Sequence, residues 1–429
     1  MVPKWVLPVA LFMAFFGVKA FFAFRFKTEQ RSDFLVMYQA AQAIAGGRPP
    51  LEGWIYWDYF AYQTPFALYE ALVLRVTGGS LIALLGVGAV AMAGTNLLVY
   101  LMARHLTGSA VAGLFCGFAY LAYPGPYLLA NTLTNDHLST FLLYLGVYLA
   151  VIALARLPSG RAWLLTGLAG IVLQLGNLSR PSGVVVCVAL VVAAVLTPVT
   201  GQRRGLARRL GLSAIGCLLT LAVYATVGLA VDACVRGSGM NSNGIGNNLP
   251  EWKFVLGLTP PELLEQAKAE IEPYRHKDDP DQGRVSARAW LERDIRRLGE
   301  SWQSVLRRQL EELWALNDSA WNAFWPELQS SSPYQLPDAT RNTWAYVMVA
   351  GERGLFLPVV MLAVAGVARL RTGRVWSHLA AFLACLVVVY ALVHLVIEVQ
   401  PRYRYLVMPA IFALGAPAWA SLPGAGKTP

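Results

Sequence analysis

The stretch that decides the fold is Leu81-IALLGVGAVAMAGTNLLVYL-Met102, an apolar run without a single charged side chain. A helix needs about 20 mostly apolar residues to cross the hydrocarbon core of a bilayer. The run therefore predicts a membrane-spanning helix.

Similar runs recur on both sides of it, so the chain of 429 residues predicts an all-α polytopic membrane protein with about ten spans. The fifth, sixth and eighth runs are the shortest. Only 14% of the residues are charged, against about 25% in soluble proteins, which excludes a soluble domain and a disordered chain. The other nine runs are 6–24, 110–130, 138–155, 163–178, 183–198, 210–231, 355–367, 378–397 and 405–422.

The net charge of +10 follows from membrane topology. With the N-terminus in the cytoplasm, the cytoplasmic loops carry twelve bases and no acid, as the positive-inside rule expects. All 25 acids and the other 23 bases (35 minus 12) then lie outside or at the outer ends of spans. The twelve bases are Lys4, Arg104, Arg156, Arg161, Arg203, Arg204, Arg208, Arg209, Arg369, Arg371, Arg374 and Lys427.

This partition predicts a protein of the plasma (inner) membrane, most simply a bacterial one, with both termini cytoplasmic. No nucleic-acid partner is implied. A site that uses carboxylates must face the extracytoplasmic side, where ATP and sugar nucleotides are absent, so a lipid-carried donor is expected there.

Two of the connections between the predicted spans are long. The first, 25–79, is expected to hold two or three short interfacial helices; Ser32 would begin one that Gly46-Gly47 ends. The second includes an amphipathic helix over 291–313. We expect an N-terminal transmembrane module (1–233, about seven spans), a mostly helical extracytoplasmic segment (234–350) and a C-terminal transmembrane module (351–429, about three spans).

Two other interpretations of local features carry less weight. Lys4 before the first apolar run resembles the start of a signal peptide. In a signal peptide the apolar stretch ends at a cleavage site, whereas this run continues through Phe21, Phe22 and Phe24. The five cysteines form neither a disulfide framework nor a metal-ligand spacing.

Two acidic motifs are candidates for chemistry. Asp33, in Arg31-SDFLVM-Tyr38, lies just after the first span, where a carboxylate can reach both a membrane-embedded donor and an acceptor. Asn135-Asp136-His137 would lie at the same depth, between the third and fourth spans. Helix capping is the alternative for both motifs, and neighbouring Asp and His rarely ligate one metal unaided.

Three arginines lie at predicted outer ends of spans. Arg402 and Arg404 flank Tyr403 in Gln400-PRYR-Tyr405, and Arg180 follows Ser179 between two short spans. Guanidinium binds phosphate in a bidentate way, and an arginine near the bilayer is costly unless it meets protein, water or an anion. Interfacial anchoring and backbone partners are the alternatives.

Together these motifs resemble the GT-C superfamily of polytopic glycosyltransferases. The branch that they resemble contains bacterial relatives of protein O-mannosyltransferases and the lipid A aminoarabinose transferases. The resemblance rests on Asp33 after the first span, the Gly46-GRP stop, Asn135-Asp136-His137, and Arg402-Tyr-Arg-Tyr405.

The resemblance implies an inverting glycosyltransferase that moves a hexose or pentose from a polyprenyl-phosphate donor to a lipid, glycan or protein acceptor. Asp33 would be the general base, and Arg402, Arg404, Arg180 and His137 would bind the donor phosphate. Asn135, Asp136, Tyr403 and Asp58 are expected to line the same cavity. No cofactor is expected, and assistance by a divalent cation is left open.

One departure leaves the acceptor open. Protein O-mannosyltransferases carry adjacent Asp and Glu at the first-loop site, whereas Ser32-Asp33 offers one acid. Two other functions compete. An O-antigen ligase or polymerase would depend on arginines and a histidine of the large loop. A transporter or lipid flippase would need ionisable groups near the bilayer midplane, where this chain has few.

Overall fold

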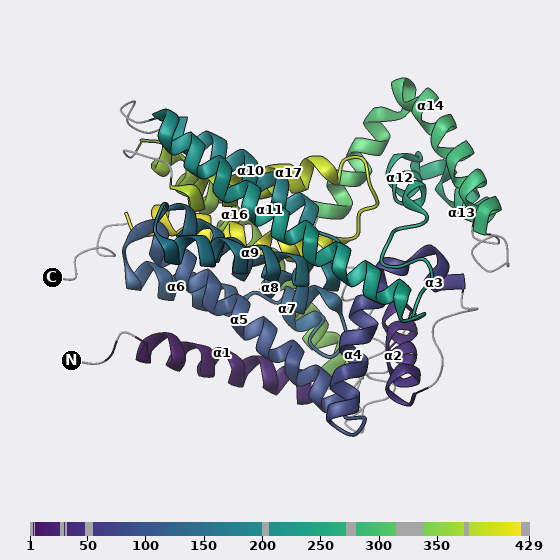
Figure 1. Cartoon of the computed structure of the whole chain (residues 1–429), viewed down its shortest axis with the longest axis horizontal. Helices are drawn as coiled ribbons and strands as arrows, with labels where there is room; N and C mark the ends of the chain where they lie inside the picture. The colour runs from purple at the N-terminus through teal and green to yellow at the C-terminus, as the bar shows by residue number, and fades with distance from the viewer. Residues whose placement is uncertain are drawn as a thin grey trace.

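The computed structural model of the chain describes residues 3, 5–25, 30, 32–47, 55–199, 206–271, 280–314, 338–372 and 377–421. Within these ranges all regular structure is helical, which confirms the all-α prediction. Figure 1 shows a bundle of long helices with a second group of helices at one end. We call that group, made of α2–α4 and α12–α14, the cap.

The bundle helices follow the predicted apolar runs. They are α1 (Val6–Arg25), α5 (Leu81–Thr107), α6 (Ala110–Ala122), α8 (Asn135–Leu154), α9 (Gly160–Ser179), α10 (Gly183–Val199), α11 (Leu206–Gly237), α16 (Asp338–Thr372), α17 (His378–Val393), α18 (Met408–Leu414) and α19 (Ala416–Trp419).

The remaining helices belong to the connections. The cap contains α2 (Ser32–Ala45), α3 (Ile55–Tyr59), η1 (Ala61–Gln63), α4 (Thr64–Val76), α12 (Pro250–Leu258), η2 (Pro261–Leu263), α13 (Leu264–Ile271) and α14 (Pro280–Trp314). Two short helices, α7 (Gly125–Leu128) and η4 (Pro401–Leu406), lie in connections between bundle helices.

Six described helices are long and apolar enough to cross a membrane: α1, α5, α8, α9, α11 and α16. The segments Gly183–Leu196, His378–Val393 and Met408–Trp419 are apolar but shorter. The fifth and eighth runs are among the shortest in the sequence, but the helices that contain them, α9 and α16, are long enough to span, so the expectation that they form the shortest spans was wrong. The third run forms a shorter helix, because Pro124 and Pro126 follow α6 and proline cannot continue a helix. The tenth begins only at Met408, because η4 precedes it.

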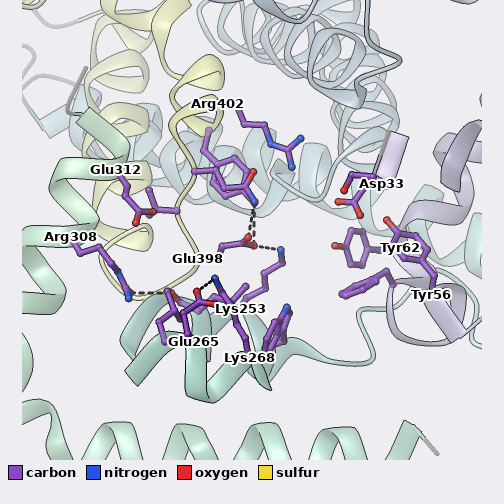
Figure 2. Close-up of a pocket in the computed structure, with 18 residues that line it drawn as sticks. Asp33, Tyr56, Tyr62, Lys253, Glu265, Lys268, Arg308, Glu312, Glu398 and Arg402 are labelled. Atoms are coloured by element: carbon purple, nitrogen blue, oxygen red, sulfur yellow. Dashed lines mark hydrogen bonds and ion pairs between the residues drawn. The ribbon is translucent and has the colours of Figure 1, made fainter. Parts of the chain in front are cut away.

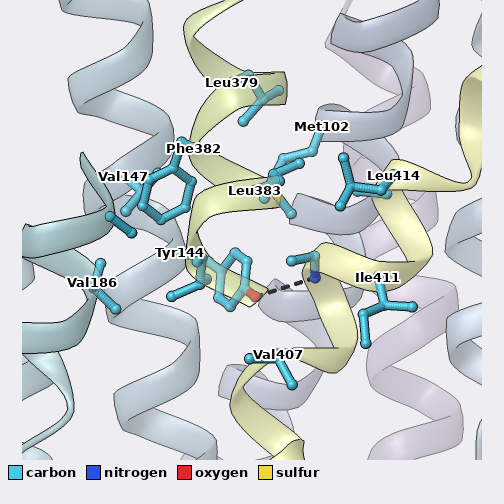
Figure 3. Close-up of a cluster of buried hydrophobic side chains, with 14 of the residues drawn as sticks. Met102, Tyr144, Val147, Val186, Leu379, Phe382, Leu383, Val407, Ile411 and Leu414 are labelled. Atoms are coloured by element: carbon cyan, nitrogen blue, oxygen red, sulfur yellow. Dashed lines mark hydrogen bonds between the residues drawn. The ribbon is translucent and has the colours of Figure 1, made fainter. Parts of the chain in front are cut away.

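The bundle core is centred on α5, which packs against α1, α6, α8 and α18. Figure 3 shows Tyr144 of α8 reaching α18 within a cluster of buried apolar side chains. The Tyr144 hydroxyl donates a hydrogen bond to the Leu406 carbonyl oxygen (2.7 Å) and accepts one from the Ala410 amide (3.1 Å). These backbone groups at the start of α18 thus find a partner inside the bundle.

Close helix packing depends on small residues, as in other membrane proteins. A Cβ atom at Gly170 of α9 would lie 2.5 Å from the Thr220 carbonyl oxygen of α11. The two helices can therefore approach as they do only because position 170 has no side chain.

The cap joins the two long connections. Tyr62 N donates to the Gly246 carbonyl oxygen (3.0 Å), and Asn248 N donates to that of Tyr59 (3.0 Å). Tyr59 also shares a buried cluster with Trp252 and Trp290. The predicted boundaries at 233/234 and 350/351 fall within α11 and α16, and the three-part division stays a prediction.

The amphipathic helix predicted over 291–313 is part of α14. Val305 and Leu313 are buried, but Ile295, Trp302 and Leu310 are exposed. The buried face of α14 also includes Ala287, Trp290 and the polar residues Asp294 and Gln309. The apolar pattern therefore predicted the helix but only part of its buried face.

Gly257 of α12 lies at a close backbone contact between the cap and the segment before η4. A Cβ atom there would lie 2.5 Å from the Val396 carbonyl oxygen and 2.6 Å from the Ile397 carbonyl carbon. We expect Gly257→Ala to destabilise the protein by about 1–3 kcal/mol, because backbone must move. Thermal unfolding in detergent measures this. Gly299→Ala in α14 is the control, because a Cβ atom there meets nothing within 4 Å. Equal unfolding temperatures of the two variants would refute the close contact at Gly257.

Candidate active site

A cavity of about 710 Å³ lies between the two long connections and the segment before α18. It is the place where residues far apart in the sequence meet, and Figure 2 shows its walls. The lining residues are Ser32, Asp33, Tyr56, Phe60, Tyr62, Trp252, Lys253, Leu256, Leu264, Glu265, Lys268, Arg308, Glu312, Glu398, Val399, Gln400, Arg402 and Tyr403.

Asp33 is a half-buried acid in the first turn of α2. Among the described residues its carboxylate accepts no hydrogen bond and forms no ion pair. Ser32, immediately before it, has φ of +51°, a region that costs a residue other than glycine energy and that often marks functional sites. The carboxylate is thus held at the cavity wall with its oxygens available.

Arg402 reaches the same cavity from η4. In Figure 2 its guanidinium and the Asp33 carboxylate face the same space. The guanidinium lies 5.3 Å from the ring of Phe34 and 5.8 Å from that of Tyr403. Its buried Nε has no hydrogen-bond partner among the described residues. Arg402 therefore brings to the cavity a positive charge that forms no ion pair with another described residue, as an anion site requires.

An ion pair that the sequence did not predict lies beside these two residues. Lys253 of α12 pairs with Glu398, which also accepts hydrogen bonds from Gln400 Nε2 (2.8 Å) and the Tyr403 hydroxyl (3.2 Å). The dashed lines in Figure 2 mark these contacts. Glu398 thus connects the second long connection to the arginine segment.

The pKa values of this pair support a charged state for both partners. Burial alone would lower the pKa of Lys253, but Tyr403 and Glu398 raise it above its ordinary value. Burial would raise the pKa of Glu398, whereas the Lys253 ammonium lowers it below its usual range. The cavity therefore holds a second positive charge whose position is determined by a carboxylate.

Arg404 turns away from the cavity and into the bundle. It is 5% exposed, pairs with Glu352 of α16, and does not line the cavity. Glu352 also accepts a hydrogen bond from the Tyr123 hydroxyl (2.9 Å). The structure thus separates Arg404 from Arg402, although one residue lies between them in the sequence.

Arg180 lies behind the cavity wall. Its guanidinium pairs with Asp136 and lies 4.7 Å from the centre of the Tyr403 ring. Thr134 Oγ1 donates to the other Asp136 oxygen (2.8 Å). Arg180 and Asp136 are therefore paired with each other, and Arg180 contacts the cavity-lining residue Tyr403. Of the four residues predicted to line the cavity, only Tyr403 is among the described lining residues.

The other predicted residues lie outside the cavity lining. His137 is buried, with its ring nitrogens 2.8 Å from the Tyr405 hydroxyl and 3.1 Å from the Leu129 carbonyl oxygen. Asn135 donates to Gln63 Oε1 (3.2 Å). Asp58 of α3 accepts a hydrogen bond from Asn243 (3.2 Å), and burial raises its pKa. None of these three side chains lines the cavity.

No metal centre emerges from the acidic and imidazole groups in the described part of the chain, since no three His, Cys, Asp or Glu side chains are grouped to hold an ion.

The Arg48-Pro49 part of the predicted Gly-Gly-Arg-Pro stop lies outside the described residues. Gly46 and Gly47 do follow the last turn of α2, with φ of +73° at Gly47.

Known proteins resemble this chain in sequence and in fold. Residues 64–229 match the sequence profile of the family described as dolichyl-phosphate-mannose-protein mannosyltransferase. No curated protein matches the sequence.

The fold resembles solved oligosaccharyltransferases of Archaeoglobus fulgidus. One is a complex with zinc and sulfate (TM-score 0.57, 13% identity, 96% of this chain and 48% of that chain). Another is AglB with an inhibitory peptide and a dolichol-phosphate (TM-score 0.54, 13% identity, 97% of this chain and 50% of that one). The chain spans about half the length of these proteins.

Proposed function

We propose that this chain, a member of the GT-C superfamily of membrane glycosyltransferases, transfers a sugar from a polyprenyl-phosphate donor to an acceptor hydroxyl, with inversion and with Asp33 as general base. One observation carries the proposal. A carboxylate and a guanidinium without partners among the described residues, Asp33 and Arg402, line the same cavity.

The chemistry is a single displacement. Asp33 takes the proton of the acceptor hydroxyl while the hydroxyl oxygen forms a bond to the anomeric carbon. The bond from that carbon to the phosphate oxygen breaks at the same time, and the electron pair leaves with the polyprenyl phosphate. Attack opposite to the leaving group inverts the anomeric configuration. Positive charge near the phosphate stabilises the transition state, because negative charge grows there.

We propose Arg402 and Lys253 as the residues that bind the donor phosphate. A lysine ammonium has three N–H donors, so Lys253 can keep Glu398 as a partner and still donate to a phosphate. Of the other predicted phosphate ligands, Arg404 and Arg180 are paired with carboxylates and His137 uses both ring nitrogens. We assign these three a positioning role, through the walls that carry Arg402 and Tyr403.

We further propose that the cavity is extracytoplasmic and that both termini are cytoplasmic, in the plasma (inner) membrane of a bacterium. The twelve bases without acids in the segments that the sequence predicts to be cytoplasmic support this orientation. The acceptor would enter between α2–α3 and α12–α14, which form the two sides of the cavity. A lipid, a glycan and a protein remain the acceptor classes.

The donor site is tested by binding. We expect Arg402→Ala to weaken the affinity for undecaprenyl phosphate by about 10-fold or more, because hydrogen bonds to charged groups contribute about 1.5–3 kcal/mol. Lys253→Gln, whose side chain can still contact Glu398, should also weaken binding. Microscale thermophoresis in detergent measures both.

Lys268→Ala is the matched control for the donor site. Lys268 lines the same cavity but pairs with Glu265 (2.7 Å) in an exposed ion pair. Its removal should change the affinity less than twofold. Unchanged affinity in Arg402→Ala would contradict the proposed phosphate site.

A further inference from the structure

Glu70 of α4 is a buried acid that the proposed reaction does not use. Its side chain is 1% exposed, and neither carboxylate oxygen has a hydrogen-bond partner among the described residues. Burying a polar group without partners is costly, and burying a charge without partners is much more so. A folded protein therefore needs a reason to keep an acid at this position.

Glu70 lines a small second cavity. Its volume is about 20 Å³, sufficient for one water molecule or one small ion. It lies between α4, the start of α5 and residues 130–138, and it shares no residue with the larger cavity. The lining residues are Phe66, Tyr69, Glu70, Leu84, Leu85, Gly88, Ala130, Thr132, Leu133, Thr134, His137 and Leu138.

The two threonine hydroxyls and the imidazole of this cavity make their hydrogen bonds elsewhere. Thr132 Oγ1 donates to the Leu129 carbonyl oxygen (2.9 Å), and Thr134 Oγ1 donates to Asp136 Oδ2 (2.8 Å). Both ring nitrogens of His137 are occupied, and no hydrogen bond joins the Tyr69 hydroxyl to Glu70. The two threonine oxygens keep lone pairs but have no hydrogen left for the carboxylate.

Such a set of oxygen acceptors suits a cation. Carboxylate and hydroxyl oxygens are the ligands that hard metal ions prefer. Charge balance then indicates whether the cation is monovalent or divalent. Glu70 is the only acid among the described residues that line the cavity, so a monovalent ion leaves the site neutral, whereas a divalent ion would leave a net positive charge among mostly apolar residues.

We propose that Glu70, with the hydroxyl oxygens of Thr132 and Thr134, binds one monovalent metal cation of the sodium class. The ion would connect α4, in the first long connection, to the segment that carries Asp136 and His137. Without a cation, burial raises the pKa of Glu70 well above its usual range, so a proton is the competitor for the same carboxylate.

Equilibrium dialysis with radioactive sodium tests the proposal on the full chain in lipid nanodiscs, with choline chloride keeping the ionic strength constant. We expect about one saturable sodium ion per chain. Glu70→Gln should lose this binding. Replacing choline by sodium should raise the melting temperature of the original protein by about 2–4 °C, and that of Glu70→Gln not at all.

Glu251→Gln is the matched control, because Glu251 Oε2 also lacks a partner among the described residues but lies in α12 away from this cavity. It should keep the sodium response. If Glu70→Gln does not fold, Thr132→Val removes one ligand oxygen and should weaken sodium binding several-fold. Potassium competition would support the same class of ion.

Three results in the binding experiments would overturn the proposal, and one in the stability experiments. They are the absence of saturable sodium binding, equal loss of binding in Glu251→Gln, and displacement of sodium by calcium or magnesium at equal concentration. A Glu70→Gln protein that is as stable as the original in choline and in sodium would show that Glu70 is a neutral acid. None of these measurements needs a sugar donor, so the proposed transferase function is tested separately.

Discussion

Asp33→Asn is expected to lower the rate of sugar transfer by about 10²- to 10⁴-fold, the usual contribution of a general base. The amide has nearly the shape of the carboxylate but cannot take the proton of the acceptor hydroxyl. Since the Asp33 carboxylate has no partner within the described structure, the variant should fold normally and bind undecaprenyl phosphate with unchanged affinity. Transfer from a polyprenyl-phosphate sugar by purified protein measures the rate.

Asp58→Asn is the matched control for this prediction. Asp58 also belongs to the first long connection, but it does not line the cavity and is held by Asn243. Its substitution should leave the transfer rate within a few-fold of normal. Near-normal turnover in Asp33→Asn would reject the proposed mechanism and favour a ligase-type or polymerase-type enzyme, which would depend on arginines and a histidine of the large loop.

Glu352→Ala is expected to destabilise the protein by about 3–5 kcal/mol, because it leaves Arg404 as a buried charge without its carboxylate. Glu352 is 4% exposed and binds both Arg404 and the Tyr123 hydroxyl. Thermal unfolding in detergent measures the change. The double variant Glu352→Ala/Arg404→Leu should recover much of the loss, since it removes the charge as well.

Glu265→Ala provides the control for the buried pair. Glu265 forms an exposed ion pair with Lys268, and such pairs contribute about 1 kcal/mol or less. If Glu352→Ala left stability unchanged and lowered donor affinity instead, Arg404 would have the phosphate-binding role that the sequence motif predicted. The two measurements therefore distinguish a structural arginine from a ligand.

The fold could be predicted largely from local patterns. Length and hydropathy define most spans, because the bilayer requires a minimum number of apolar residues in each. Errors arose where local breakers shorten a run, as Pro124 and Pro126 do after α6. Asp33 was identified from its place after the first span, and it does line the cavity. Its catalytic role stays a prediction.

The site was less predictable because its contacts join distant parts of the chain. Lys253 meets Glu398 across 145 positions, and no local motif marks either residue. Arg402 and Arg404 look equivalent in the sequence, yet one faces the cavity and the other meets Glu352 of α16. Side-chain direction in a short 3₁₀ helix is decided by what packs around it.

The sequence by itself determined the membrane class, most of the spans and the few charges that depart from the positive-inside pattern. It could do so because the bilayer acts on each segment according to its own composition. Only the tertiary structure decided which of these charges are available to a ligand. Arg404, Arg180 and Asp136 are paired with groups of opposite charge, whereas Asp33 and Arg402 form no ion pair with another described residue. Whether a charged side chain forms an ion pair depends on which helices pack beside it. Because a buried charge without a partner is costly, this packing decides which charges are paired and which can bind a ligand.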